Sequence, residues 1–264
     1  MSTPTLLEAP PTNGPSRSVL RGLAPVFLAG AIAGMLVGGL GSRIVMRISA
    51  LAAPDRAQGS VTEAGAIVGR ITADGTLFLF VFVGIGTAVI GTAVYLATRP
   101  WLPRRRRVRA VAFGALELVV FGTTVIEAGN PDFTILGRPL LNVALFCTLF
   151  VVHGATLVLL IAPCGRFVSR MAKAPWRWRA VDIATLFGLP GTLVGVAAIG
   201  MRSGGSDRLT WIVLVTCATG LTLIDRRRAR PITIPALRVA GAFALAMIVV
   251  GGAAQLLDAV TTIV

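Results

Sequence analysis

The amino-acid sequence predicts an all-α protein, a polytopic integral membrane bundle of about seven transmembrane helices with a cytoplasmic N-terminus and an external C-terminus. Of its 264 residues, 55% are hydrophobic and 14% are charged, whereas a soluble domain carries roughly 25% charged residues. The apolar residues form uninterrupted runs of about 20 residues, the length that a helix needs to cross roughly 30 Å of hydrocarbon. The basic residues gather between these runs, which is typical of a chain that crosses a membrane repeatedly.

Each apolar run is interpreted as a helix, because a helix satisfies every backbone hydrogen-bonding group in lipid. The runs are too long and too continuously apolar for the strands of a membrane barrel. Residues 1–20 are rich in proline, serine and threonine and predict a disordered cytoplasmic tail, and residues 21–264 predict a single transmembrane domain. The spans are expected at residues 25–42, 77–98, 108–126, 140–161, 181–200, 209–224 and 237–257.

The distribution of basic residues predicts the orientation. Sixteen of the 25 basic residues lie in three segments, residues 99–109, 166–179 and 226–238. With the N-terminus inside, 18 basic residues are cytoplasmic and 7 are external, as expected because arginine-rich segments stay on the cytoplasmic side. These arginines would lie against anionic lipid headgroups of the bilayer. The net charge of +14 is therefore explained by membrane topology, and we expect no nucleic acid partner.

Small residues predict how the helices pack and bend. Gly30, Gly34 and Gly38 recur every four residues on one face of the first span, and such faces let two helix backbones approach closely. They predict either packing within the chain or association with a second copy or a membrane partner protein. The fifth span holds three residues that break helices, Gly188, Pro190 and Gly191. The kink that they predict is either structural or the discontinuity found at transporter sites.

Glu117 is the strongest candidate for a functional side chain, because it is the single acidic residue of the third span. A carboxylate in hydrocarbon must be neutral, paired or turned toward a polar cavity. We expect it to couple movement of a proton or cation, or else to be a neutral acid bonded to a neighbouring helix. His153, the single histidine, would relay protons with Glu117 if their helices face each other. Asn142, in the same span as His153, would join helices through a hydrogen bond.

Arg43 and Arg47 lie four residues apart and therefore share one helical face at the external end of the first span. Positive charge on the external side opposes the usual distribution. The pair would either extend to outer headgroups, or bind Asp55, Glu63 or Asp74, or form an anion or lipid-phosphate site, since paired guanidinium groups match phosphate geometry.

The sequence lacks the motifs of several enzyme classes. Its single lysine, Lys173, lies between spans, so there is no Walker A lysine and no Schiff-base lysine within a span. Neither an HExxH nor a GxSxG motif occurs. The three cysteines form no CxxC pair, so neither a disulfide nor a metal site is predicted. We expect no enzyme activity and no cofactor.

Three short motifs resemble a set of uncharacterised multi-pass membrane proteins of actinobacteria and related bacteria. The motifs are Arg43 with Arg47, Gly69-Arg70-Ile71-Thr72 followed by Gly75-Thr76-Leu77-Phe78, and Asn130-Pro131-Asp132-Phe133. The resemblance covers the first four predicted helices. It implies a bacterial plasma (inner) membrane location, and it implies no activity.

Three functions are compatible with these features. The leading hypothesis is a small permease-like transporter of an ion or small solute, with Glu117 as the coupling group. The second is a non-transporting membrane subunit or scaffold that docks a partner protein through its glycine faces and basic loops. The third is a lipid-phosphate-handling membrane enzyme that uses Arg43 and Arg47.

Overall fold

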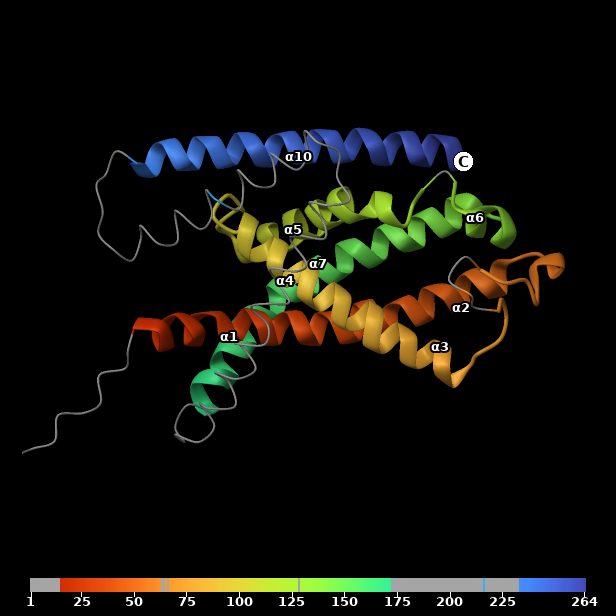
Figure 1. The fold of residues 1–264 in the computed structure, drawn as a ribbon, viewed down its shortest axis with the longest axis horizontal. Coiled ribbons are helices and arrows are strands. Elements are labelled where there is room, and N and C mark those ends of the chain that lie inside the picture. Colours follow the sequence, from red (N-terminus) through yellow and green to blue (C-terminus); the bar gives the residue numbers. More distant parts are fainter. Residues whose placement is uncertain (1–14, 63–64, 66, 128, 172–215, 217–232) are drawn as a thin grey trace, which may run out of the picture.

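The computed structural model describes residues 15–62, 65, 67–127, 129–171, 216 and 233–264. This part of the chain is all-helical apart from one isolated bridge between Val61 and Ile67 (Figure 1). Several helices are long and apolar enough to cross a membrane, namely Gly22–Ala52, Ala73–Thr98, Pro139–Met171 and Pro235–Ile263. These four helices contain the spans expected at residues 25–42, 77–98, 140–161 and 237–257. The helical, membrane-type character predicted from the sequence is therefore confirmed.

The first long helix consists of α1 (Pro15–Ala33), the π-helical segment η1 (Gly34–Gly41) and α2 (Ser42–Ala52). It begins within residues 1–20, where we expected a tail, and it continues past the predicted end of the span. Arg43 and Arg47 do not end the helix, because arginine is a good helix former. At 1.5 Å per residue, the 31 residues of Gly22–Ala52 span about 46 Å, more than the hydrocarbon layer requires.

The second long helix is built in the same way, from α3 (Ala73–Phe78), the π-helical η3 (Leu79–Gly84) and α4 (Ile85–Thr98). It packs against the first helix, η3 on η1 and α4 on α1. The glycine face of the first helix lies at this contact. Gly30 lies beside Thr92, Gly34 beside the Gly84 carbonyl and Gly38 beside Thr87.

The third predicted span, residues 108–126, is shorter in the structure. It corresponds to α5 (Arg106–Phe121), of 16 residues, followed by the 3-10 turn η4 (Gly122–Thr124). The Thr124 hydroxyl donates to the Phe121 carbonyl at 2.7 Å, and this bond stabilises the end of the helix. The α5 helix is therefore shorter than the roughly 20 residues that a span requires.

The remaining helical elements of the described residues are the 3-10 turn η2 (Asp55–Ala57), the short α6 (Pro131–Leu136), the long α7 (Pro139–Met171) and α10 (Thr233–Ile263). In Figure 1 the end of α2, the start of α3, α6 and the C-terminus lie at one end of the bundle, which we call the α6 end. The spans predicted at residues 181–200 and 209–224 lie outside the described residues, as do Gly188, Pro190 and Gly191.

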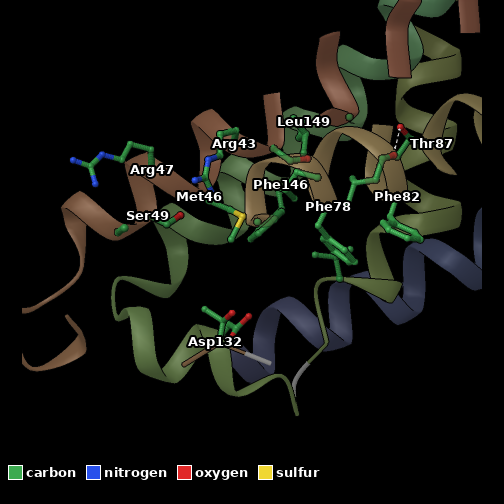
Figure 2. Close-up of a pocket in the computed structure, with 18 of the residues that line it drawn as sticks. Arg43, Met46, Arg47, Ser49, Phe78, Phe82, Thr87, Asp132, Phe146 and Leu149 are labelled. Carbon is green, nitrogen blue, oxygen red and sulfur yellow. Dashed lines mark hydrogen bonds between the residues drawn. The ribbon is translucent and has the colours of Figure 1, made fainter. Parts of the chain in front are cut away.

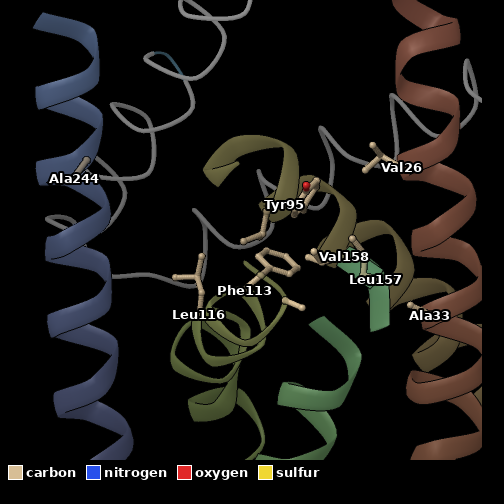
Figure 3. Packing of buried hydrophobic residues seen from close by; sticks show 10 residues of the cluster. Val26, Ala33, Tyr95, Phe113, Leu116, Leu157, Val158 and Ala244 are labelled. Atoms are coloured by element: carbon tan, nitrogen blue, oxygen red, sulfur yellow. The ribbon is translucent and has the colours of Figure 1, made fainter. Parts of the chain in front are cut away.

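The centre of the bundle is a cluster of apolar side chains from α1, α4, α5, α7 and α10 (Figure 3). Phe113 of α5 is fully buried, and its ring packs edge-on against the Tyr95 ring with centroids 5.2 Å apart. The α10 helix is joined to this cluster through Ala244 and through Trp101, whose ring nitrogen donates to the Arg238 carbonyl at 2.8 Å. Close packing of this kind holds helices together in lipid.

Candidate functional site

A buried acid–histidine pair joins α5 and α7. The Nδ1 atom of His153 lies 2.7 Å from the Oε2 atom of Glu117, and 1% of Glu117 and 5% of His153 are exposed. One proton lies between these two atoms, and either residue can hold it. The sequence placed both groups within spans, and the structure brings them together. The contact stabilises an acid in an apolar bundle, because it gives one atom of each group a hydrogen-bond partner.

Three glycines make room for this pair, and the sequence analysis did not single them out. Gly114 of α5 lies against the Val151 carbonyl of α7, and a Cβ on Gly154 would lie 2.7 Å from the Gly114 Cα. The two backbones therefore cross in direct contact beside the pair. On α4, a Cβ on Gly91 would lie 2.7 Å from both Glu117 Oε1 and His153 Cε1. Glycines within spans and close to polar residues were the signal that could have identified these positions.

A layer of fully buried apolar side chains lies one helical turn from the pair, on the side away from the α6 end. Phe113 is four residues before Glu117, and Leu157 is four residues after His153. Val94 is three residues after Gly91. All three side chains have no exposed surface. This apolar layer separates the acid–histidine pair from the other end of the bundle.

On the opposite side, the pair faces a cavity of about 1210 Å³ that extends to the α6 end and to the segment around Gly69 and Arg70. Figure 2 shows Arg43 on one wall, Phe78 and Phe82 on a second, and Asp132 across the hollow from Arg43. Arg47 lies on the same helix as Arg43, and in this view its side chain extends away from the hollow. Glu117 and His153 line the cavity as well. The cavity therefore extends from the acid–histidine pair toward the α6 end only, and the pair lies at its inner end, which we call its floor.

The unsatisfied polar atoms of the described residues gather in this cavity. Buried side-chain atoms without a hydrogen-bond partner are found on Arg43, Ser49, Glu117, Asn142 and His153, and all five residues line the cavity. Buried polar groups are nearly always hydrogen-bonded, and an unsatisfied one destabilises a protein by about 1–3 kcal/mol. Their concentration in one place is typical of a binding cavity.

Arg43 and Arg47 both line this cavity. Within the described part of the chain neither arginine forms a salt bridge, so pairing with Asp55 or Asp74 does not occur, and Glu63 lies outside it. The Nη1 atom of Arg47 donates to the Gly69 carbonyl at 3.4 Å. The Nη2 atom of Arg43 is buried and unpartnered. Of the alternatives weighed from the sequence, this geometry favours an anion site.

Asn142 lies apart from the acid–histidine pair, although all three residues line the same cavity. It is eleven residues before His153 on α7, which corresponds to about 16 Å along the helix axis. Its amide nitrogen donates to the Gly137 carbonyl at 2.7 Å, so it fixes the α6–α7 turn rather than joining two long helices. Its Oδ1 atom has no partner.

No group of three potential ligands for a metal ion occurs among the described residues. Comparison of the chain with protein-family models, with curated proteins and with solved structures finds no match. The interpretation of function therefore depends on the chemistry and geometry of the cavity.

Proposed function

We propose that this protein is a small permease-like carrier of a solute in a bacterial inner membrane, with Glu117 and His153 holding the proton that couples its movement. The observation that carries the proposal is the acid–histidine pair at the floor of a large cavity. No catalytic step is proposed for it.

The chemistry of the pair supports a coupling role. When the carboxyl is protonated and the imidazole is neutral, or when both groups are ionised, the pair has no net charge, and gain or loss of a proton changes the charge by one unit. Glu117 Oε1 and His153 Nε2 have no hydrogen-bond partner among the described residues, so each can exchange a proton with a group in the cavity. A group whose charge changes inside a low-dielectric bundle strongly alters the affinity for a charged solute nearby.

The apolar layer of Phe113, Leu157 and Val94 supports a carrier with alternating access. A carrier must close one side of its binding site while the other is open. The cavity lies on one side of the pair, and the layer lies one turn away on the other. Movement of α4, α5 and α7 at this layer would open the pair to the opposite end of the bundle.

The topology that accompanies this proposal has seven spans, with the N-terminus cytoplasmic and the C-terminus external. The excess of basic residues in residues 99–109, 166–179 and 226–238 supports it. In this orientation the α6 end and the cavity face the outside. The resemblance to actinobacterial multi-pass proteins agrees with this location.

Reconstituted transport tests the proposal. The full chain would be purified and placed in liposomes, and uptake of radiolabelled sodium, rubidium, chloride, phosphate and hexyl phosphate would be measured at several pH values. We expect at least one flux above that of empty liposomes, and we expect it to vary with pH. Glu117→Gln should abolish the pH dependence, because the amide keeps the size of the side chain but cannot exchange a proton.

Asp258→Asn is the matched control, because it also replaces an acid with its amide. Asp258 lies on α10, is exposed and does not line the cavity. Its flux and pH profile should equal those of the unmodified protein. The coupling role is wrong if Glu117→Gln behaves like this control. Absence of every flux in the unmodified protein would instead favour the non-transporting subunit.

A further inference from the structure

Arg43 places an unpaired positive charge in the wall of the cavity. Within the part of the chain that the structure describes, its Nη2 atom is buried without a hydrogen-bond partner, and no carboxylate forms a salt bridge with it. A guanidinium group keeps its charge inside proteins. Arg43 as a whole is half-buried, and removing part of its charge from solvent is unfavourable unless an opposite charge pairs with it. This arginine is therefore suited to receive an anion from the cavity.

Arg47 provides a second guanidinium one helical turn further along α2. It also lines the cavity, but its side chain is exposed and its hydrogen bond to the Gly69 carbonyl is long at 3.4 Å. The carboxylates of Asp74 and Asp132 line the cavity as well. The head of an anionic ligand would therefore lie toward α2 and away from these two acids. Two guanidinium groups on one face match the oxygens of a phosphate or carboxylate.

The rest of the cavity suits an apolar chain. Phe78 and Phe82 stack on each other with ring centroids 5.0 Å apart, and 47% and 66% of these residues are exposed. Phe146 and Phe150 of α7 line the cavity too. The volume of about 1210 Å³ exceeds the roughly 300–1,000 Å³ of most small-molecule pockets. A simple ion would occupy only a small part of it.

We propose that the cavity binds an amphiphile with an anionic phosphate or carboxylate head and an apolar chain. Arg43 and Arg47 bind the head, and the phenylalanines contact the chain. The inference rests on the proposed function, since it names the substrate class of the same cavity. Glu117 and His153 line the same cavity, so a change in their proton count changes the charge of the cavity that the ligand occupies.

Native mass spectrometry of the full chain in a nonionic detergent tests the inference. Four probes would be compared: palmitoyl lysophosphatidate, palmitate, lysophosphatidylcholine of the same chain length, and inorganic phosphate. We expect one molecule of lysophosphatidate or palmitate per chain. Lysophosphatidylcholine, whose head has no net charge, and inorganic phosphate, which has no chain, should bind far more weakly.

Arg43→Gln should weaken lysophosphatidate binding about tenfold or more, as expected for loss of a charge-assisted hydrogen bond. Arg43→Lys keeps the charge and should recover part of the affinity. Arg56→Gln is the matched control, because Arg56 is exposed near the same end of the bundle and does not line the cavity. If Arg43→Gln does not fold, Arg47→Gln should show a smaller loss in the same direction.

The inference is overturned if lysophosphatidylcholine binds as well as lysophosphatidate, if inorganic phosphate binds as well, or if the Arg43 and Arg56 variants behave alike. These outcomes are distinct from failure of the carrier. A pH-dependent flux without amphiphile binding would contradict the amphiphile as ligand but support the transport function. Binding of the amphiphile without any flux of it would support the amphiphile as ligand but contradict the transport function.

Discussion

Replacing Gly91 with alanine adds one methyl group directly beside the acid–histidine pair. The new Cβ would lie 2.7 Å from Glu117 Oε1 and 2.7 Å from His153 Cε1. Ordinary van der Waals contact begins near 3.4 Å, so both side chains would have to retreat. They are held to each other by a 2.7 Å hydrogen bond and cannot both move without disturbing it.

The matched control is Gly86→Ala on the same helix, because a Cβ on Gly86 would meet nothing within 4 Å. Both variants gain about 1 kcal/mol from the higher helix propensity of alanine. The difference between their free energies of unfolding therefore reports only the steric cost of the added methyl group at Gly91, about 1–3 kcal/mol. Gly91→Ala should melt roughly 2–12 °C below Gly86→Ala.

Thermal unfolding of the purified chain in detergent, followed by thiol-reactive dye or circular dichroism, measures this difference. A second variant that combines Gly91→Ala with Glu117→Ala removes the oxygen that the methyl group meets, and it should recover part of the lost stability. Equal melting temperatures for the Gly86 and Gly91 variants would refute the close approach of α4 to the pair.

Two further predictions concern the apolar layer and the topology. Phe113→Ala should destabilise the protein by about 3–5 kcal/mol and raise the proton permeability of liposomes loaded with a pH-sensitive dye. Val111→Ala, at a position that is 63% exposed on the same helix, should have neither effect. Equal proton permeability with the two variants would show that the layer does not block protons. Alkaline phosphatase fused after Ala53 should be active and a fusion after Arg106 inactive, because the arginine-rich segment stays in the cytoplasm; the reverse pattern would overturn the proposed orientation.

The sequence predicted the membrane-type helices well and their lengths poorly. Hydropathy reports which residues tolerate lipid, whereas a helix continues wherever backbone bonding and propensity allow. The helix Gly22–Ala52 therefore runs past Arg43 and Arg47. The opposite error occurred in the third span, where the 3-10 turn at Gly122–Thr124 ends α5 within an apolar run.

The candidate site was predictable in part. A lone acid and a lone histidine in separate spans suggested their meeting, because each is unfavourable in lipid without a partner. Asn142 was expected to join two helices through a hydrogen bond, but it bonds instead to the Gly137 carbonyl, which depends on the geometry of the α6–α7 turn. The roles of Gly91, Gly114 and Gly154 depend on where three helices cross, and sequence periodicity does not specify crossing points.

The π-helical segment η1 has a consequence for the direction in which Arg43 points. In a π-helix the backbone bonds join residues five apart rather than four, so each turn holds about one additional residue. Each additional residue changes the rotational phase of everything that follows by about 100°. The eight residues of η1 immediately precede α2, and four of them are glycine. The direction in which Arg43 points therefore depends on the π-helical, glycine-rich segment η1 that precedes it. If η1 formed a regular α-helix instead, the guanidinium group of Arg43 would face a different neighbour.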